Sequence, residues 1–279
     1  MSRPVIALTT DFGQADGYVG TMKGVILGIC PRAEMVDVSH EIRPQAVRQA
    51  AYVLHTAAPY FPAGTVHLVV VDPSVGTARR PIVVQTERAT YVAPDNGVLS
   101  LVLAQDPARL AVHLTASATA ATARYCLPEI SATFHGRDIF APAAAHLASG
   151  VDPHCMGDLL PLSDLVTLSA LHPKPQADGS WQGEILHVDR FGNLVTNYQF
   201  PMTSEQYANP DLHFAVEAGG EWVVGLSRTY ADVAPGELVA YVGSSGYLEV
   251  AVREGNASVR LDVDVGDPVQ INRHVTGRP

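Results

Sequence analysis

The feature that most constrains the fold is a change in the spacing of apolar residues about 165 positions into the chain. Before it, uninterrupted apolar runs such as PVIALTT (4–10), GTVHLVVVD (64–72) and RPIVVQT (80–86) alternate with segments of helical spacing. Strands buried on both faces have such runs, and strand–helix alternation is typical of parallel sheets. We therefore predict an α/β N-terminal domain, with a mainly parallel sheet and helices on both faces.

The helical segments of this domain have recognisable ends. Residues 17–29 have helical spacing and stop at Pro31, and residues 44–58 are predicted as a helix with Pro44 at its first position. A further strand is expected at 33–40, residues 89–105 are predicted as a strand, a turn and a helix, and 132–150 as a loop that opens a helix.

Beyond the change in spacing the chain contains short alternating strands. A Pro- and Gly-rich stretch at 172–181 is a plausible linker, and strands are expected within 183–197, 212–219, 221–227, 237–252 and 258–271. A helix signal remains at 202–208 (MTSEQYA). We predict a C-terminal all-β barrel domain, with residues 1–172 and 173–279 as the two domains.

Composition excludes several kinds of partner. The net charge of −10 argues against nucleic acid and anionic membranes, and the hydrophobic content of 47% predicts a well-packed chain. No signal peptide or apolar run of membrane-spanning length is expected. The three cysteines lack a CxxC spacing, which is typical of reduced thiols in a cytoplasmic protein.

Two aspartates end apolar strands. Asp11 follows the first strand and Asp72 follows the run HLVVV. Because ligands bind beyond the carboxyl ends of strands in α/β sheets, both carboxylates are candidates to face one crevice. The alternative is that each caps a turn or a following helix.

A histidine on a flexible loop is a further candidate. In TFHGRD, His135 precedes Gly136 and can act as a neutral base or donor, although a histidine satisfied in the core is the alternative. Four residues are conceivable metal ligands: His135, Asp138, His146 and His172. No metal is predicted, because their spacing does not match HExxH and the chain has no Cys cluster. GxSxG, GxGxxG and Walker motifs are also missing from the sequence.

The β domain has two turns whose residues suit ligand binding. In DRFGNLVTN, Phe191 offers an aromatic face near the amide of Asn193, a pairing that suits a purine ring. GSSG (243–246) offers hydroxyls and backbone N–H groups that can hold a carboxylate. Ordinary hairpin turns are the alternative for both.

Six stretches in order resemble one family. They are LTTDFG (8–13), VVVDPSVGTARRPI (69–82), PDNG (94–97), TFHGRDIFAPAAAHLA (133–148), DRFGN (189–193) and GSSGYLEVA (243–251). They resemble the S-adenosyl-L-methionine (SAM) hydrolases (adenosine-forming), or SAM hydroxide adenosyltransferases, relatives of fluorinase and chlorinase. The resemblance implies an α/β domain joined to a β-barrel, and a homotrimer with its site between the N domain of one subunit and the C domain of the next.

The resemblance also implies a reaction. Water or hydroxide attacks C5′ of SAM in an S_N2 step and yields adenosine and L-methionine, with SAM as substrate and no cofactor. The implied catalytic residues are Asp72, Arg79 and His135, with Arg79 preferred to Arg80 on spacing. Ser74 stands where the family usually has glycine. In the halogenases a Tyr stands at the position that matches Asp72, and a Tyr–Ser pair stands where this chain has His135 and Gly136. The resemblance therefore favours water over halide as the nucleophile.

Substrate contacts follow from the same resemblance. Asp11 matches the residue that binds the ribose hydroxyls. The adenine contacts are Phe191 and Tyr230 by stacking, Asn193 by a hydrogen bond, and Val252 and Ala257 through their backbone; the methionine contacts are Asp189, Ser244, Ser245 and Glu249. The alternatives are a halide-using 5′-halo-5′-deoxyadenosine synthase, a non-catalytic SAM- or adenosine-binding protein, and a metal-dependent hydrolase.

Overall fold

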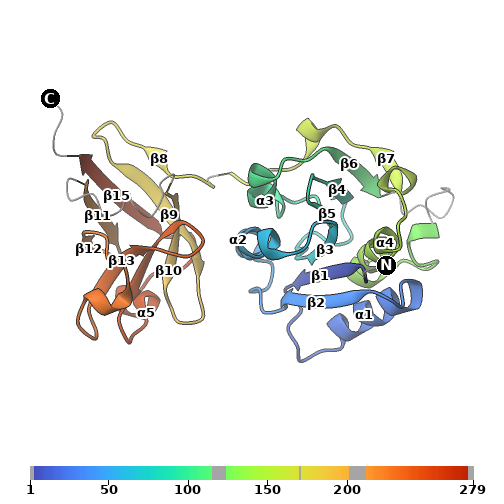
Figure 1. Ribbon diagram of the computed structural model, residues 1–279, viewed down its shortest axis with the longest axis horizontal. Helices are drawn as coiled ribbons and strands as arrows, with labels where there is room; N and C mark the ends of the chain where they lie inside the picture. Colours follow the sequence, from blue (N-terminus) through green and yellow to red (C-terminus); the bar gives the residue numbers. More distant parts are fainter. Residues whose placement is uncertain (1–2, 115–123, 170, 201–211, 276–279) are drawn as a thin grey trace. The chain divides into compact units, whose positions relative to one another are not determined.

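The chain forms two compact units, residues 1–168 and 169–279. The computed structural model describes residues 3–114, 124–169, 171–200 and 212–275 (Figure 1). The predicted domain boundary lies four residues beyond the observed one (172 − 168). Across the described residues, none of the helices has both the length and the apolar character that crossing a membrane requires.

The first unit is built on one seven-stranded sheet with the order β2-β1-β3-β5-β4-β6-β7. Strands β2, β1, β3 and β5 are parallel, whereas β4 pairs antiparallel with β5 and β6, and β7 pairs antiparallel with β6. The strands are β1 Val5–Thr10, β2 Glu34–Ser39, β3 Thr65–Val70, β4 Pro81–Gln85, β5 Ala89–Pro94, β6 Leu110–Leu114 and β7 Gly157–Leu159.

Helices cover both faces of this sheet, as the unbroken apolar strands require. Along β3 and the residue that follows it the side chains alternate: Leu68 and Val70 pack with α1 and α4, while Val69 and Val71 pack with α2 and α3. The α-helices among the described residues of this unit are α1 Tyr18–Ile29, α2 Val47–Ala57, α3 Ser100–Gln105 and α4 Ala141–Ala148 (Figure 1). Short helical turns are η1 Ala58–Tyr60, η3 Gly136–Phe140, η4 Pro153–Cys155 and η5 Leu162–Asp164.

The α/β class is confirmed. The sheet is mixed because β4 and β5 are joined by a tight turn. In this turn the N–H and the hydroxyl of Thr86 both donate to the carbonyl of Ala89. A turn this short can join only antiparallel strands, since a parallel crossover needs about a dozen residues. The parallel half contains the strands that end on Asp11 and Asp72.

The helix expected at 44–58 begins at Val47, so the prediction of Pro44 at its first position is wrong. Gln45 has φ of +68°, outside the helical region, and its N–H donates to Oδ2 of Asp11 at 2.8 Å. The residues ahead of α2 therefore form a loop that holds a strand-end carboxylate.

The second unit is a nearly closed antiparallel barrel-like sheet with the order β12-β11-β15-β9-β10-β14-β13, and β8 adds to β9. Its interior is apolar, with Ile185, Leu194, Val216, Leu248 and Val250 fully buried. The strands are β8 Lys174–Pro175, β9 Trp181–Val188, β10 Leu194–Gln199, β11 Leu212–Ala218, β12 Glu221–Val224, β13 Leu238–Val242, β14 Tyr247–Val252 and β15 Pro268–Val275. A short turn, η7, spans Tyr230–Asp232.

The prediction of strand within 258–271 is wrong in its first part and confirmed in its last. Helix α5 spans Ala257–Leu261, and β15 begins at Pro268. The side chain of Asn256 caps α5 by accepting from the N–H of Val259 at 2.8 Å, and Asp262 ends it in a left-handed conformation. The helix signal at 202–208 lies outside the described residues.

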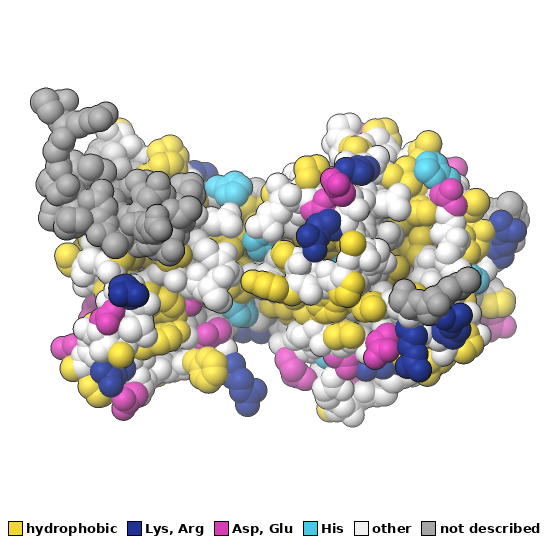
Figure 2. All heavy atoms as spheres, in the orientation of Figure 1, with side chains coloured by type: hydrophobic (Ala, Val, Ile, Leu, Met, Phe, Trp, Pro, Cys, Tyr) yellow, Lys and Arg dark blue, Asp and Glu magenta, His cyan; other side chains and the backbone are white. Residues whose placement is uncertain are grey.

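Acidic and basic side chains are spread over the visible surface of both units (Figure 2). On the face shown in Figure 2, acidic and basic side chains are interspersed among hydrophobic and neutral ones. This mixing agrees with a chain whose charges are mostly solvated.

Candidate active site

A buried ion pair follows the end of β3. Nε of Arg79 donates to Oδ1 and Oδ2 of Asp72 at 3.0 and 2.8 Å, and Nη2 of Arg79 also donates to Oδ2. The side chains of Arg79 and Asp72 are only 7% and 6% exposed, and the guanidinium also lies 5.1 Å from the ring centre of Phe140. The spacing match that favoured Arg79 over Arg80 therefore selects the arginine that contacts Asp72.

His135 joins this pair through one ring nitrogen. Nη2 of Arg79 lies 2.8 Å from Nδ1 of His135. Because a guanidinium only donates, Nδ1 must accept, and the proton of the neutral ring lies on Nε2. Burial and the Arg79 cation lower the pKa of His135, which favours this neutral tautomer. His135 is thus prepared to donate a hydrogen bond from Nε2.

Asp11, Asp72 and His135 line one cavity of about 560 Å³. Parallel strands β1 and β3 carry the two aspartates to the same sheet edge, as their position after adjacent strands predicted. Burial raises the pKa of Asp11, and the nearby Asp72 carboxylate acts in the same direction. Phe12, Tyr18 and Phe134 form an aromatic wall of this cavity that the sequence analysis did not identify; their ring centres are 5.1 to 5.9 Å apart.

The turn between Asp72 and Arg79 tolerates Ser74. Gly76, not Ser74, has the positive φ, at +80°, and a Cβ there would lie 2.6 Å from the carbonyl oxygen of Ala132. Close approach of this turn to the segment before His135 therefore depends on Gly76. The carbonyl of Ser74 accepts from both the N–H and the hydroxyl of Thr77, and any residue at this position can make these backbone contacts.

Arg80 has a different partner. Its Nε and Nη2 donate to Oδ2 of Asp95 at 2.9 and 2.5 Å, and the Asp95 side chain is 2% exposed. Oδ1 of Asp95 accepts from the N–H of Val166 at 2.9 Å. Arg80 therefore ties β4 to the β5–α3 turn and to the segment near residue 166.

A second cluster lies in the barrel unit around Asp189. Its Oδ1 accepts from the N–H groups of Phe191 and Asn193 at 2.8 and 2.9 Å, and its Oδ2 accepts from the Asn193 amide at 2.8 Å. Gly192 between them has φ of +85°, and a Cβ there would overlap the Asn256 side chain. The Phe191 side chain is left 75% exposed at the tip of this turn.

Tyr241 connects the remaining polar residues of this cluster. Its hydroxyl lies 2.6 Å from that of Tyr230 and donates to Oε2 of Glu249 at 2.6 Å, and the Asn193 amide lies 3.4 Å from the Tyr230 hydroxyl. Burial raises the pKa of Glu249, and the Asp189 carboxylate adds to that shift. Tyr241 was not among the predicted site residues, because the sequence marks it only as a tyrosine within an apolar strand next to the GSSG turn.

The other predicted contacts lie nearby in different settings. Ser244 and Ser245 are in the β13–β14 turn, where the Glu249 carboxylate packs so closely that a Cβ on Gly243 would overlap it. The side chains of Val252 and Ala257 are buried in the barrel core, which leaves only their backbone for any ligand contact.

The conceivable metal ligands are separated. Asp138 pairs with Arg137 and accepts from the N–H of Ser131, His146 packs edge-on against Tyr125, and His172 lies in the other unit. Within the part of the chain that the structure describes, no three His, Cys, Asp or Glu side chains are grouped so as to hold a metal ion.

The two units and their clusters match a known two-domain family. The model of the SAM hydroxide adenosyltransferase N-terminal domain matches residues 6–157, and that of the C-terminal domain matches residues 183–270. The chain belongs to the SAM hydroxide adenosyltransferase family.

Individual relatives cover nearly the whole chain. It is 43% identical to an (R)-S-adenosyl-L-methionine hydrolase of Thermus thermophilus over 96% of this chain and 99% of that one, and 41% identical to another from Salinispora tropica over 96% and 97%. A fluorinase of Nocardia brasiliensis is 27% identical over 96% and 97%. The crystal structure of an uncharacterized conserved protein from Thermotoga maritima aligns with a TM-score of 0.84 at 38% identity, over 95% and 99% of the two chains.

The different partners of the adjacent arginines predict different effects on stability. Arg80→Met leaves the buried Asp95 carboxylate without its cation and should lower the free energy of unfolding by about 1–3 kcal/mol. Urea denaturation of the variant measures this, with the exposed Arg109→Met as control. An unchanged unfolding midpoint would show that the Arg80–Asp95 pair does not contribute to stability.

The contact between Arg79 and His135 predicts a pKa response. His135 should titrate below the ordinary histidine value of about 6.5, because burial and the adjacent cation disfavour its protonated form. Arg79→Met removes that cation and leaves the Asp72 carboxylate, so the pKa of His135 should rise. NMR titration of the imidazole C–H resonances measures both values, and Arg109→Met should leave them unchanged. A fall in the pKa of His135 on removing Arg79 would contradict the proposed contact.

Proposed function

We propose that this protein hydrolyses SAM to adenosine and L-methionine by attack of water or hydroxide at C5′ of the ribose. The observation that carries the proposal is the Asp72–Arg79–His135 cluster, two of whose members line a cavity together with Asp11. Family membership and relatives named as SAM hydrolases support it. Because those relatives are named for the (R) epimer of the sulfonium, we propose (R)-SAM as the preferred substrate.

The reaction requires a positioned nucleophile rather than an acid. The C5′–O bond forms as the C5′–S bond breaks, and methionine leaves as a neutral thioether that needs no proton. One proton of the attacking water is released to solvent by way of Asp72. Holding the water in line with the C5′–S bond is therefore the main task of the site.

The cluster suits that task. Asp72 has two acceptor oxygens, and its contacts with Arg79 fix their direction. Since Nδ1 of His135 accepts from Arg79, its Nε2–H can donate to the water oxygen but cannot remove a proton from it. We therefore assign His135 the role of orienting the water, and Asp72 that of accepting one of its hydrogens.

The proposed substrate contacts divide between the units. Asp11 lies in the same cavity as Asp72 and is assigned the ribose hydroxyls. The barrel cluster is assigned the adenine and methionine ends: Phe191, Tyr230, Asn193, Val252 and Ala257 for adenine, and Asp189, Ser244, Ser245 and Glu249 for methionine. No metal or cofactor takes part in the proposed reaction.

We also propose a cytoplasmic homotrimer in which the α/β unit of one subunit and the barrel unit of the next form each site. The ring of Phe191 supports this arrangement: it is assigned to stack on adenine, yet it is 75% exposed in the single chain, so a second surface is needed to enclose the ring and the adenine.

The reaction can be tested by its products. Incubation of the protein with (R)- or (S)-SAM should yield equal amounts of adenosine and L-methionine, faster for the (R) epimer, with or without EDTA. Asp72→Asn should lose most turnover, on the order of 2–4 kcal/mol in the transition state, and retain its fold. Arg80→Met, although less stable, should keep kcat per folded molecule.

Chromatography separates the alternatives. A predominance of 5′-chloro-5′-deoxyadenosine in chloride buffer would identify a halide-using synthase. Loss of turnover in EDTA would identify a metal-dependent hydrolase. SAM binding without any product would identify a binding protein.

The shared site can be tested by mixing two inactive variants. Asp72→Asn damages only the α/β half and Asn193→Ala only the barrel half. If each site combines halves from two subunits, co-expression of the two variants in equal amounts should restore about a quarter of the sites. In random assembly about one site in four receives an intact α/β half and an intact barrel half. If both halves came from one subunit, the mixture would stay inactive. Sedimentation equilibrium gives the oligomeric state, and mixing Asp72→Asn with Arg79→Met is the negative control.

A further inference from the structure

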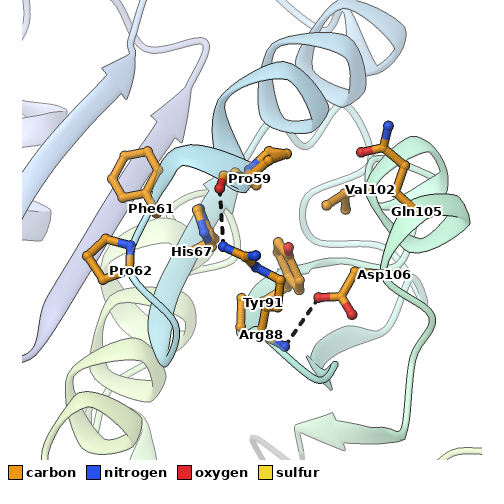
Figure 3. Close-up of a pocket in the computed structure, with 11 residues that line it drawn as sticks. Pro59, Phe61, Pro62, His67, Arg88, Tyr91, Val102, Gln105 and Asp106 are labelled. Atoms are coloured by element: carbon orange, nitrogen blue, oxygen red, sulfur yellow. Dashed lines mark hydrogen bonds between the residues drawn. The ribbon is translucent and has the colours of Figure 1, made fainter. Parts of the chain in front are cut away.

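A second cavity lies at the opposite end of the sheet in the α/β unit. It has a volume of about 170 Å³ and lies between η1, the amino ends of β3 and β5, and α3 (Figure 3). His67 near the start of β3 lines it, whereas Asp72 follows the other end of that strand, about 16 Å away along an extended chain. None of its residues belongs to the proposed active site, so its occupancy is independent of the proposed reaction.

His67 is the unusual residue of this cavity. It is 1% exposed, and neither of its ring nitrogens has a hydrogen-bond partner among the described residues. Burial lowers the pKa of His67 to about 4, so at neutral pH the ring is uncharged, with one N–H donor and one acceptor nitrogen. Buried polar groups are nearly always paired, and an unpaired one next to a cavity points to a group that occupies the cavity.

The surroundings of His67 favour a flat ring. The imidazole stacks on Tyr91, its partner on the neighbouring strand, with ring centres 5.1 Å apart and planes within 17°, and it meets Phe61 edge-on at 5.2 Å. Pro59, Pro62 and Val102 add apolar surface. A cavity of similar size, about 150 Å³, is known to hold benzene, so a single six-membered ring fits here.

The rim gives no preference for a charged ligand. Arg88 supplies one cation and Asp106 one anion. Nη2 of Arg88 donates to the carbonyl of Pro59 at 3.2 Å, and the N–H of Arg88 donates to Asp106 at 3.3 Å, so Arg88 bridges two walls of the cavity (Figure 3). Because Arg88 is exposed, this bridge is the solvent-facing part of the cavity wall. Gln105 adds an amide that can both donate and accept.

We propose that this cavity is a binding site for a small neutral nitrogen heterocycle of pyrimidine-base size. Its flat faces pack against the aromatic and proline walls, and its edge pairs with His67 after the Arg88 bridge moves aside. An apolar ring would leave the His67 nitrogens unpaired, and a charged ring would lose its hydration beside a cation and an anion whose effects on it oppose each other.

Cytosine is the probe that tests the site. Calorimetric titration of the full chain at neutral pH should show one cytosine per chain, and crystals soaked in cytosine should show it beside His67. His67→Phe keeps an aromatic ring and removes both nitrogens, so it should weaken cytosine binding by about tenfold or more while benzene still binds. His113→Phe, on β6 and outside the cavity, is the matched control.

Two further variants keep the test decisive if His67→Phe is poorly folded. Val102→Phe fills the cavity with His67 intact and should abolish cytosine binding. Phe191→Ala, in the barrel cluster, should leave it unchanged, which excludes binding at the proposed active site. The proposal is overturned if cytosine does not bind, if it binds His67→Phe as tightly as the unsubstituted chain, or if the crystals show only water beside His67.

Discussion

The buried pair of Asp72 and Arg79 is the interaction on which the candidate site depends. With both side chains more than nine-tenths buried, each charge is compensated chiefly by the other. The same guanidinium contacts Nδ1 of His135 and the face of Phe140, so one side chain fixes the carboxylate, the histidine tautomer and the packing of η3. The turn from Asp72 to Arg79 must therefore be tight, and the positive φ of Gly76 with its close approach to Ala132 makes it so. Geometry in this site is set by one ion pair and one glycine.

Much of the first unit follows from its sequence, for reasons that particular residues make clear. Adjacent parallel strands end at the same edge, so reading Asp11 and Asp72 as strand ends was sufficient to bring them to one cavity. The start of α2 was not readable in this way. Pro44 is a good first residue of a helix, but the Gln45 N–H bonds to Asp11, a partner 34 positions earlier, and that contact replaces the first helical turn. The hairpin between β4 and β5 escaped prediction because a buried antiparallel strand has the same apolar run as a parallel one.

The barrel unit shows a different limit of sequence reasoning. The turn around Asp189 was identifiable because Asp, Gly and Asn follow one another at turn spacing. Tyr241 was not, because a tyrosine in a strand usually packs in the core, and only the fold places its hydroxyl between Tyr230 and Glu249. Likewise, alternating residues in 258–271 predict strand, which is found from Pro268 onward, whereas the Asn256 cap favours a helix in the first part of that range. In each case a contact between distant or capping residues outweighed the local pattern, which carries no information about such partners.

Charge gives a physical reason to expect water rather than halide as the nucleophile. The cavity is lined by the carboxylates of Asp11 and Asp72 and by the cation of Arg137, which is paired with Asp138, while Arg79 is paired with Asp72. A halide entering such a site would lose its hydration and face two negative groups without a free positive partner, which is costly in a buried setting. Water loses less on entry and gains an acceptor in Asp72 and a donor in His135. The sulfonium of SAM, by contrast, is attracted by the same carboxylates. One electrostatic arrangement thus favours the cationic substrate and disfavours an anionic competitor of water.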